Sequence, residues 1–362
     1  DRSIQFAAEQ LHVDRVTELL AKSGYIVIMD TDTGDILAMA SVQRNDDDVV
    51  EVTSGNYAAV NAYEPGSVAK VVTVAAALNE QTVTPDTTFV VPWRRQYADD
   101  LLRDASEHPD ELMTVEQILV KSSNIGTIDI QQTLGRGDWD TARETHWDYL
   151  RAFGFGEPTS LDFPNESPGI LKHWDDLWGS ERVTVAYGQG FAATPIQMVS
   201  AVNAIANDGM YVAPRLVDGT VGPDGELAPA EPSATHEIVR PEVAAEMQYM
   251  MRQVVCRGTA KRAQDGVEGF SIAGKTGTGL KAQPNGTYLD EDGNRVYYAS
   301  FAGFFPAEDP EITVLVSIDE PPAGDINRFG GTAAAPVFAE LVPTIVHELG
   351  IEPPAETMPC AE

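Results

Sequence analysis

The hydrophobic pattern of the first sixty residues predicts one helix followed by a β-hairpin. Apolar side chains recur at helical spacing between residues 4 and 21, with Phe6 and Leu20 among them. Apolar runs at 25–29 and 36–41 then flank a polar stretch rich in Asp, Thr and Gly, which is typical of a turn between two strands. We therefore expect a helix and two antiparallel strands at the start of the chain.

The middle of the chain, as far as Gly190, is predicted to be mostly helical. Apolar positions at helical spacing mark 114–120 and 125–132, and Pro195 opens a further buried helix. Residues 213–237 are rich in Pro, Gly and acidic side chains, which indicates an exposed excursion.

The last part of the chain combines strands with helices. A helix is predicted over 243–255, three strands over 270–279, 297–306 and 312–318, and a final helix over 333–349. We expect the late strands to pair with the early hairpin. The predicted class is α+β with three layers, in which helices flank a central, mainly antiparallel sheet and a large helical subdomain is added.

The composition is that of an acidic globular protein. The 362 residues are 43% hydrophobic and carry 56 acidic against 24 basic side chains, a net charge of −32. This length allows one large domain or two modest ones. The negative charge argues against nucleic acid as a partner and against adhesion to anionic lipid. No apolar run approaches the roughly 18–20 residues of a membrane span. The chain starts without Met, and we expect it to be a piece of a longer protein.

The two cysteines, Cys256 and Cys360, leave two interpretations open. Neither lies in a spacing typical of zinc sites, so no metal is expected. In an oxidising compartment they can pair and close a loop of about 100 residues, a stabilisation of ~4–5 kcal/mol in the chain-entropy model. Alternatively, they are two separate thiols.

Ser67 and Lys70 form a candidate nucleophile and base. Pro65 and Gly66 precede them, and the alanine-rich run beyond predicts a buried helix. Side chains three residues apart share one helix face. Burial lowers the pKa of a lysine, so that Lys70 can take a proton from the Ser67 hydroxyl. The four-residue S-x-x-K pattern alone recurs by chance.

Two further motifs make the combination specific. Ser122-Ser123-Asn124 is an S-x-N motif, and Lys275-Thr276-Gly277-Thr278 is a K-T-G motif. The order of the three motifs is that of penicillin-binding proteins and serine β-lactamases. We expect the helical part of the chain to pack against the sheet and leave a cleft where the three motifs meet.

The chain resembles class B penicillin-binding proteins from Asp1 to about Leu349. The similarity extends beyond the motifs to several short stretches, namely 63–67, 188–190, 194–197, 258–260 and 298–304. Residues 319–322, 330–331 and 335–338 most resemble the septal, cell-division transpeptidases of that class.

This resemblance implies a serine acyltransferase without a cofactor that cross-links peptidoglycan stem peptides ending in D-Ala-D-Ala during septal wall synthesis. It implies acylation by β-lactam antibiotics, a division glycosyltransferase and other divisome proteins as partners, and a cytoplasmic-membrane anchor with the catalytic domain outside. The transpeptidase domain would span 1–362, with a sheet lobe from about 1–60 and 265–349, a mainly helical lobe from about 61–264 and a tail at 350–362.

Three features depart from the class. The membrane helix and the N-terminal non-catalytic domain usual in it are missing from the chain. Position 69 is Ala where a larger residue is more common, and residues 352–362 match nothing in the class.

The resemblance also implies the roles of the motif residues in acylation. Ser67 would be the nucleophile, and Lys70 its base. Ser122 would relay a proton to the leaving amine, and Asn124 would hold Lys70 and the substrate amide. Lys275 would set the field around Ser122. Which lysine is the base at each step stays open.

The K-T-G segment would bind the substrate or the β-lactam. Lys275 would attract the terminal carboxylate, Thr276 and Thr278 would donate hydrogen bonds to it, and Gly277 would complete the binding strand. The backbone amides of Ser67 and Thr278 would form the oxyanion hole.

Two alternatives share these motifs. A class A serine β-lactamase needs a glutamate that activates water for deacylation; Glu166 is a candidate, but its flanking residues do not match that loop. A non-catalytic β-lactam sensor or scaffold can keep all three motifs.

Overall fold

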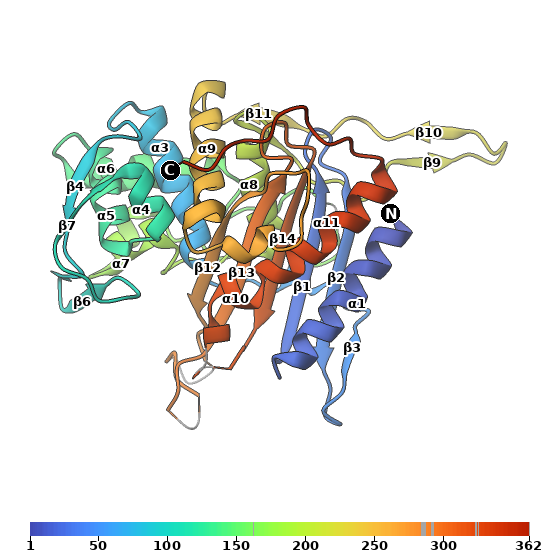
Figure 1. Ribbon diagram of the computed structural model, residues 1–362, viewed down its shortest axis with the longest axis horizontal. Coiled ribbons are helices and arrows are strands. Elements are labelled where there is room, and N and C mark those ends of the chain that lie inside the picture. The colour runs from blue at the N-terminus through green and yellow to red at the C-terminus, as the bar shows by residue number, and fades with distance from the viewer. Residues whose placement is uncertain (162, 284–286, 291–292, 323, 325, 362) are drawn as a thin grey trace.

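A six-stranded antiparallel sheet forms the centre of the molecule (Figure 1). The structure is a computed structural model and describes residues 1–361 except 162, 284–286, 291–292, 323 and 325. The strand order is β12-β13-β14-β1-β2-β3. The strands are β1 (Ser23–Asp30), β2 (Ile36–Arg44), β3 (Val50–Val52), β12 (Ala273–Leu280), β13 (Tyr297–Phe305) and β14 (Ile312–Asp319).

Pairing between the two ends of the chain completes this sheet. β1 pairs with β2 on one side and with β14 on the other, in a register that places Ser23 opposite Asp319 and Asp30 opposite Ile312. The prediction that the late strands pair with the early hairpin is therefore confirmed. β12 lies at the edge of the sheet, on the side nearest the helical lobe (Figure 1).

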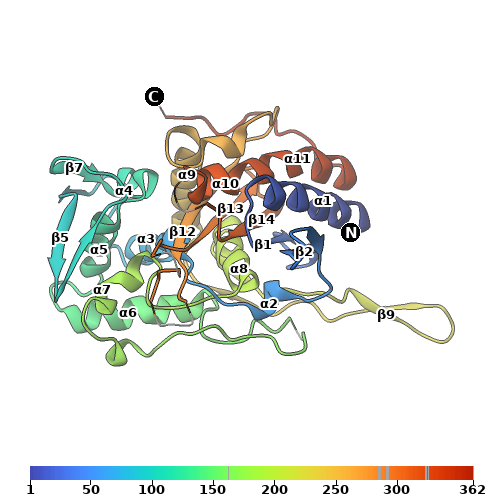
Figure 2. The same cartoon turned by 90° about the horizontal axis from the view of Figure 1, so that it is seen from below.

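Helices cover both faces of the sheet. Figure 2 shows α1 (Arg2–Glu18) and α11 (Ala335–Leu349) on one side and α8 (Pro195–Ala206) on the other. α9 (Pro241–Arg257) packs against β12. The strands β1 and β14 are buried along nearly their whole length between these layers. The predicted α+β class with three layers is confirmed.

The buried face of α1 differs from the one that its apolar pattern indicates. Phe6 and Leu20 are 64% and 73% exposed, whereas His12 is fully buried together with Ile4, Ala8 and Val16. Positions spaced by four residues form one face of the helix, and a histidine occupies one of them. Leu20 lies beyond the last turn and has a positive φ of 50°.

The helical lobe lies beside the edge strand β12 (Figure 1). Its helices include η1 (Gly66–Ala69), α3 (Lys70–Asn79), α4 (Val115–Lys121), α5 (Asn124–Thr133) and α6 (Trp139–Ala152). The expected helices are present, but the lobe also contains short strands that the sequence did not predict, namely β4 (Thr88–Val91), β5 (Arg94–Tyr97), β6 (Asp100–Arg103) and β7 (Glu111–Thr114). Half of the residues of β5 and β6 are charged, so the hydrophobic pattern does not reveal these strands.

Shorter elements connect these layers. They are α2 (Tyr57–Val60), η2 (Trp174–Asp176), α7 (Glu181–Thr184), η3 (Val185–Tyr187), β8 (Met210–Val212), β9 (Gly219–Val221), β10 (Leu227–Pro229), β11 (Thr235–Glu237), η4 (Lys261–Gln264), η5 (Ile326–Arg328) and α10 (Gly330–Ala333). The expected excursion at 213–237 contains the β9–β10 hairpin, which extends away from the body (Figure 1).

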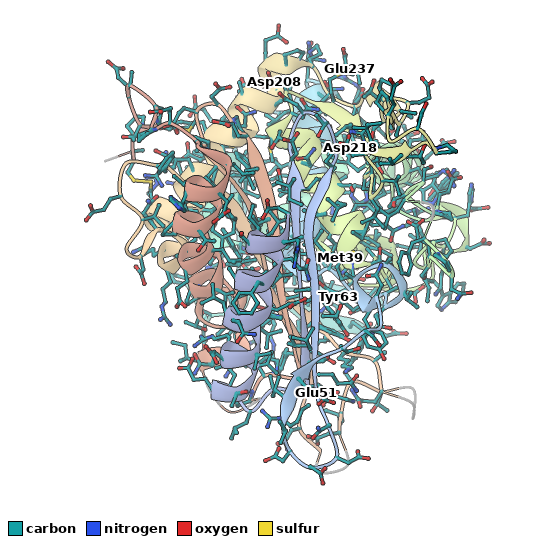
Figure 3. The ribbon with its side chains drawn as sticks, turned by 90° about the vertical axis from the view of Figure 1, so that its right-hand side faces the viewer. Met39, Glu51, Tyr63, Asp208, Asp218 and Glu237 are labelled. Atoms are coloured by element: carbon teal, nitrogen blue, oxygen red, sulfur yellow. A yellow bond between two sulfur atoms is a disulfide. The ribbon has the colours of Figure 1, made fainter. Side chains whose placement is uncertain are left out.

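A disulfide joins Cys256 of α9 to Cys360 of the tail, 104 residues apart in sequence (Figure 3). Of the two interpretations of the cysteines, the structure therefore contains the paired one. The tail also accepts hydrogen bonds from α9: Arg252 Nε donates to the carbonyl of Met358, and Gln253 Nε2 to that of Pro359.

Among the described residues, no helix has the length and apolar character needed to cross a membrane. In the same part of the chain, no group of three or more His, Cys, Asp or Glu side chains is arranged to hold a metal ion.

Candidate active site

Ser67 lies in the tight turn η1 that leads into the buried helix α3. The turn is held by the Gly66 amide, which donates to the carbonyl of Gly188 at 3.0 Å. Gly66 has a φ of +54°, and a Cβ there would lie 2.8 Å from the carbonyl carbon of Thr278. Only glycine allows this contact, which sets the Ser67 turn against the K-T-G strand.

Lys70 is fully buried and donates to groups of the S-x-N motif. Its Nζ lies 2.5 Å from the Ser122 carbonyl oxygen, 3.2 Å from Ser122 Oγ and 2.8 Å from Asn124 Oδ1. Burial lowers the pKa of Lys70 to about 7, against the opposing effect of the Asp104 charge. A substantial fraction of the amine is therefore neutral near pH 7.

The local backbone explains why the S-x-N motif reaches Lys70. α4 ends at Lys121, and the left-handed φ of 59° at its C-cap, Ser122, turns the chain sharply. α5 then begins at Asn124, with Ser123 as its cap, since Ser123 Oγ accepts from the Gly126 amide at 2.9 Å. We expected Asn124 between two helices; it is instead the first residue of the second one.

The second lysine, Lys275, is also fully buried and meets the same hydroxyl. Its Nζ donates to Ser122 Oγ at 2.9 Å and to the Thr276 carbonyl at 3.1 Å. Burial, followed by the nearby charge of Lys70, lowers the pKa of Lys275. The Ser122 hydroxyl thus lies between two amines, a geometry that can pass a proton from one to the other.

The orientation of β12 follows from its hydrogen bonds to β13. The Lys281 amide donates to the Val296 carbonyl, in the register that pairs Gly279 with Tyr298. Since pairing groups alternate along an antiparallel strand, the backbone N–H and C=O of Thr278 point away from β13, toward the Ser67 turn. An amide of the K-T-G strand therefore faces the segment that carries Ser67.

Packing around the K-T-G segment requires a glycine at position 277. A Cβ there would lie 2.3 Å from Ser300 Oγ and 2.8 Å from the Pro65 carbonyl oxygen. Gly277 thereby lets the strand approach the segment that carries Ser67.

The two threonines of the motif have different neighbours. The Thr276 hydroxyl lies 2.6 Å from that of Thr259, and Thr278 Oγ1 accepts from the Gly330 amide at 3.4 Å. If Thr259 donates to Thr276, the Thr276 proton is left to donate to a ligand.

Two residues near the site were not assigned from the sequence. Asp104 is buried, and its Oδ1 accepts from the amides of Asn124 and Ile125 at 2.6 and 3.0 Å. It lies in an acidic stretch where no spacing marks it. Thr259 belongs to a Gly-Thr-Ala stretch that carried the family resemblance, which was the available signal.

A sheet and a helical lobe that bring S-x-x-K, S-x-N and K-T-G into contact are the arrangement of penicillin-binding proteins and serine β-lactamases. Residues 24–342 match the model of the penicillin binding protein transpeptidase domain, and the chain belongs to this family.

Similar proteins support this assignment. The chain is 33% identical to penicillin-binding protein PbpB of Mycolicibacterium smegmatis, over 95% of this chain and 54% of that protein. The crystal structure of penicillin binding protein 3 from Mycobacterium tuberculosis, complexed with aztreonam, is similar with a TM-score of 0.85 and 31% identity, over 99% of this chain and 80% of that one.

A shorter relative matches along nearly its whole length. The structure of the TP domain of penicillin-binding protein 3 from Burkholderia pseudomallei has a TM-score of 0.81 and 28% identity, and the match covers 98% of this chain and 96% of that one. By contrast, the chain spans about half the length of PbpB.

Proposed function

We propose that this domain is a peptidoglycan D,D-transpeptidase that works through an acyl-enzyme on Ser67. The observation that carries the proposal is the Ser122 hydroxyl between two buried lysines, beside the turn that bears Ser67. Membership of the transpeptidase family supports the same reaction.

In the proposed acylation, neutral Lys70 takes the proton of Ser67 as Oγ attacks the carbonyl of the penultimate D-Ala. The C–N bond to the terminal D-Ala then breaks, and the leaving amine receives a proton through Ser122. The lowered pKa of Lys70 and the bonds of its Nζ to Ser122 and Asn124 support this assignment.

Binding of the substrate is assigned to the edge strand. Lys275 attracts the terminal carboxylate, the hydroxyls of Thr276 and Thr278 donate to it, and Gly277 lets the strand come close. The amides of Ser67 and Thr278 form the oxyanion hole, where one donor is worth ~3–4 kcal/mol. The outward direction of the Thr278 amide supports this role.

In the second half-reaction, the amine of another stem peptide attacks the acyl group and frees Ser67. β-Lactams would acylate the same hydroxyl. Glu166, the candidate residue of a β-lactamase, accepts from the backbone N–H and the hydroxyl of Thr159 through Oε1. That oxygen is engaged within its own loop, which favours the transpeptidase.

We further propose that the domain works in septal wall synthesis, as part of a longer protein that is anchored in the cytoplasmic membrane, with this domain outside and with divisome proteins as partners. The disulfide supports an oxidising compartment. The stretches near 319–322 and 335–338 that resemble division transpeptidases support the septal role.

Labelling with fluorescent penicillin tests the proposed nucleophile. The wild-type domain should form one adduct, located on Ser67 by mass spectrometry, and Ser67→Ala should form none. Ser106→Ala, at an exposed serine, is the matched control and should label like the wild type. Labelling of Ser67→Ala at the wild-type level would overturn the assignment.

Nitrocefin separates the transpeptidase from the alternative hydrolase. A stoichiometric burst that stops after one turnover is expected. Sustained hydrolysis would instead identify a β-lactamase.

A further inference from the structure

Asp104 connects the loop after β6 to the start of α5. It is 7% exposed, and its Oδ1 accepts from the first two amides of α5, those of Asn124 and Ile125. The first amides of a helix have no partner within the helix, and a carboxylate can accept hydrogen bonds from them. Its negative charge is also stabilised by the positive end of the helix dipole. The S-x-N turn is thereby fastened to a part of the chain that contains none of the three motifs.

The residue before Asp104 fixes the Asn124 side chain. Asn124 Nδ2 donates to the Arg103 carbonyl at 2.9 Å, which leaves Oδ1 to accept from Lys70 Nζ at 2.8 Å. Residues 103 and 104 therefore set both the backbone position and the rotamer of the group that holds Lys70.

The other oxygen of Asp104 meets a histidine. Oδ2 lies 3.1 Å from His108 Nε2, and His108 Nδ1 lies 2.7 Å from the Pro109 carbonyl oxygen. Both ring nitrogens face acceptors, so both must carry a proton to form these bonds, and the ring is then an imidazolium. Burial lowers the pKa of His108, but the bonds to Pro109 and Asp104 and the charge of Asp104 raise it overall.

We propose that Asp104 is a positioning residue of the acyl transfer. It holds Asn124 against Lys70 and contributes a negative charge near the Lys70 amine, and His108 partly neutralises the charge of Asp104. This inference rests on the proposed function. It assigns to residues 104–110, the loop between β6 and β7, a role in the reaction, although this loop lies outside the three motifs.

Other charged or titratable groups surround the pair. Around Asp104 and His108 these are Lys70, Glu111 with its partner Lys121, Asp129 with its partner Arg95, and Tyr187. Among the groups that influence Lys70, the Asp104 charge acts to raise its pKa. Loss of this charge should therefore make Lys70 easier to deprotonate.

The test is the pH profile of acylation by fluorescent penicillin, measured from pH 5 to 10 on the domain with its disulfide intact. Asp104→Asn keeps an oxygen that can accept from the two amides but removes the charge. The acid limb of the pH profile of this variant should move to lower pH by about half a unit to one unit. His108→Gln removes the opposing charge, and its limb should move to higher pH.

Three further variants complete the design. Asp104→Ala also loses the acceptor, and its acylation rate should fall about 10- to 100-fold at pH 8. Asp110→Asn removes an exposed carboxylate of the same loop and should leave the profile unchanged. When His108→Gln is combined with Asp104→Asn, it should no longer move the acid limb of the pH profile to higher pH, because the Asp104 charge that His108 neutralises is absent.

A purely structural role for Asp104 predicts something different. In that case Asp104→Asn and His108→Gln would lower the melting temperature and reduce the rate evenly at every pH, and the limb would stay in place; this result overturns the inference. Failure of the proposed function is distinguishable, because the wild type itself would then not be acylated at Ser67.

Discussion

At the scale of single residues, the centre of the site is one hydroxyl shared by two buried amines. Lys70 and Lys275 cannot both carry a full charge at this separation without strong mutual repulsion, since neither is solvated. Ser122 Oγ, within 3.2 Å of both, accepts from whichever is protonated and can donate to the neutral one. A proton can therefore pass between the two amines through Ser122, as the proposed reaction requires.

Replacing the proposed base gives the first prediction. Lys70→Ala should slow acylation by a factor of roughly 10²–10⁴, the usual contribution of general base catalysis. In the wild type the rate should rise with pH around 7, because Lys70 acts in its neutral form. Stopped-flow labelling with fluorescent penicillin measures the acylation rate of the variant and the pH dependence of the wild-type rate. Lys261→Ala, at an exposed lysine, is the control; a Lys70→Ala variant that reacts at the wild-type rate would assign the base to another group.

A buried histidine outside the site gives the second prediction. Burial lowers the pKa of His12 to about 3, against the opposing effect of its contact with the Ser317 backbone. The unfolded chain binds the proton near pH 6.5 and the folded one does not, so stability falls as pH drops from about 6.5 to 3, by about 1.4 kcal/mol per pH unit. His146, whose pKa burial also lowers to about 3, adds a similar slope.

Urea unfolding at pH 6.5 and 4.5 measures this effect. His12→Gln should lose about 2–3 kcal/mol less than the wild type over this interval. The exposed His347→Gln is the control. Equal losses in wild type and His12→Gln would show that His12 does not contribute.

At the scale of elements, the K-T-G strand is supported from behind by the segment after α9. The Thr259 hydroxyl lies 2.6 Å from that of Thr276, and a Cβ on Gly331 of α10 would lie 2.0 Å from the Thr259 carbonyl oxygen. Three segments thus meet at the threonine that is proposed to bind the substrate carboxylate.

Removing this support gives the third prediction. Thr259→Val keeps the shape of the side chain but deletes a hydrogen bond worth about 1 kcal/mol, so that acylation by penicillin should become roughly 3–10 times slower. The change should appear mainly in binding, as a raised half-saturating concentration. Thr259→Ser, which keeps the hydroxyl, should restore the wild-type value; if it does not, the hydroxyl is not the relevant group.

The elements also show how far the sequence could be used. Helical spacing predicted α4 and α5, Pro195 marked the start of α8, and apolar runs predicted all five long strands, because these elements are largely buried. The site residues of the three motifs could be named because their spacing is specific. β5 and β6 were missed because they are short and half of their residues are charged, and Asp104 was missed because its role depends on a tertiary contact 20 residues away.

At the scale of the whole molecule, the Cys256–Cys360 disulfide ties the tail to α9. The sequence could not decide whether these cysteines pair, because the docking of the tail depends on backbone contacts such as that of Arg252 with Met358. The pairing of the two chain ends in the sheet was predicted, because the early hairpin and the three late strands were the strands expected from the sequence.

Loss of the disulfide gives the fourth prediction. Cys360→Ser should lower the free energy of unfolding by up to about 4–5 kcal/mol, the value expected for a loop of this length. Cys256→Ser and the double variant should lose the same amount, because one bond is removed in each case. Urea midpoints measure the loss, and labelling of Ser67 should persist in all three variants. Additive losses would mean that the cysteines contribute separately.

The sheet that joins the two ends of the chain also governs the order of biosynthesis. The apolar strand β1 is made within the first thirty residues, but its neighbour β14 follows only at 312–319. A ribosome adding about 5–20 residues per second leaves β1 without this partner for roughly 15–60 s. During that interval an unpaired, hydrophobic strand edge is open to other chains. Successful maturation of the domain therefore depends on whatever shields its first strand until the last one emerges.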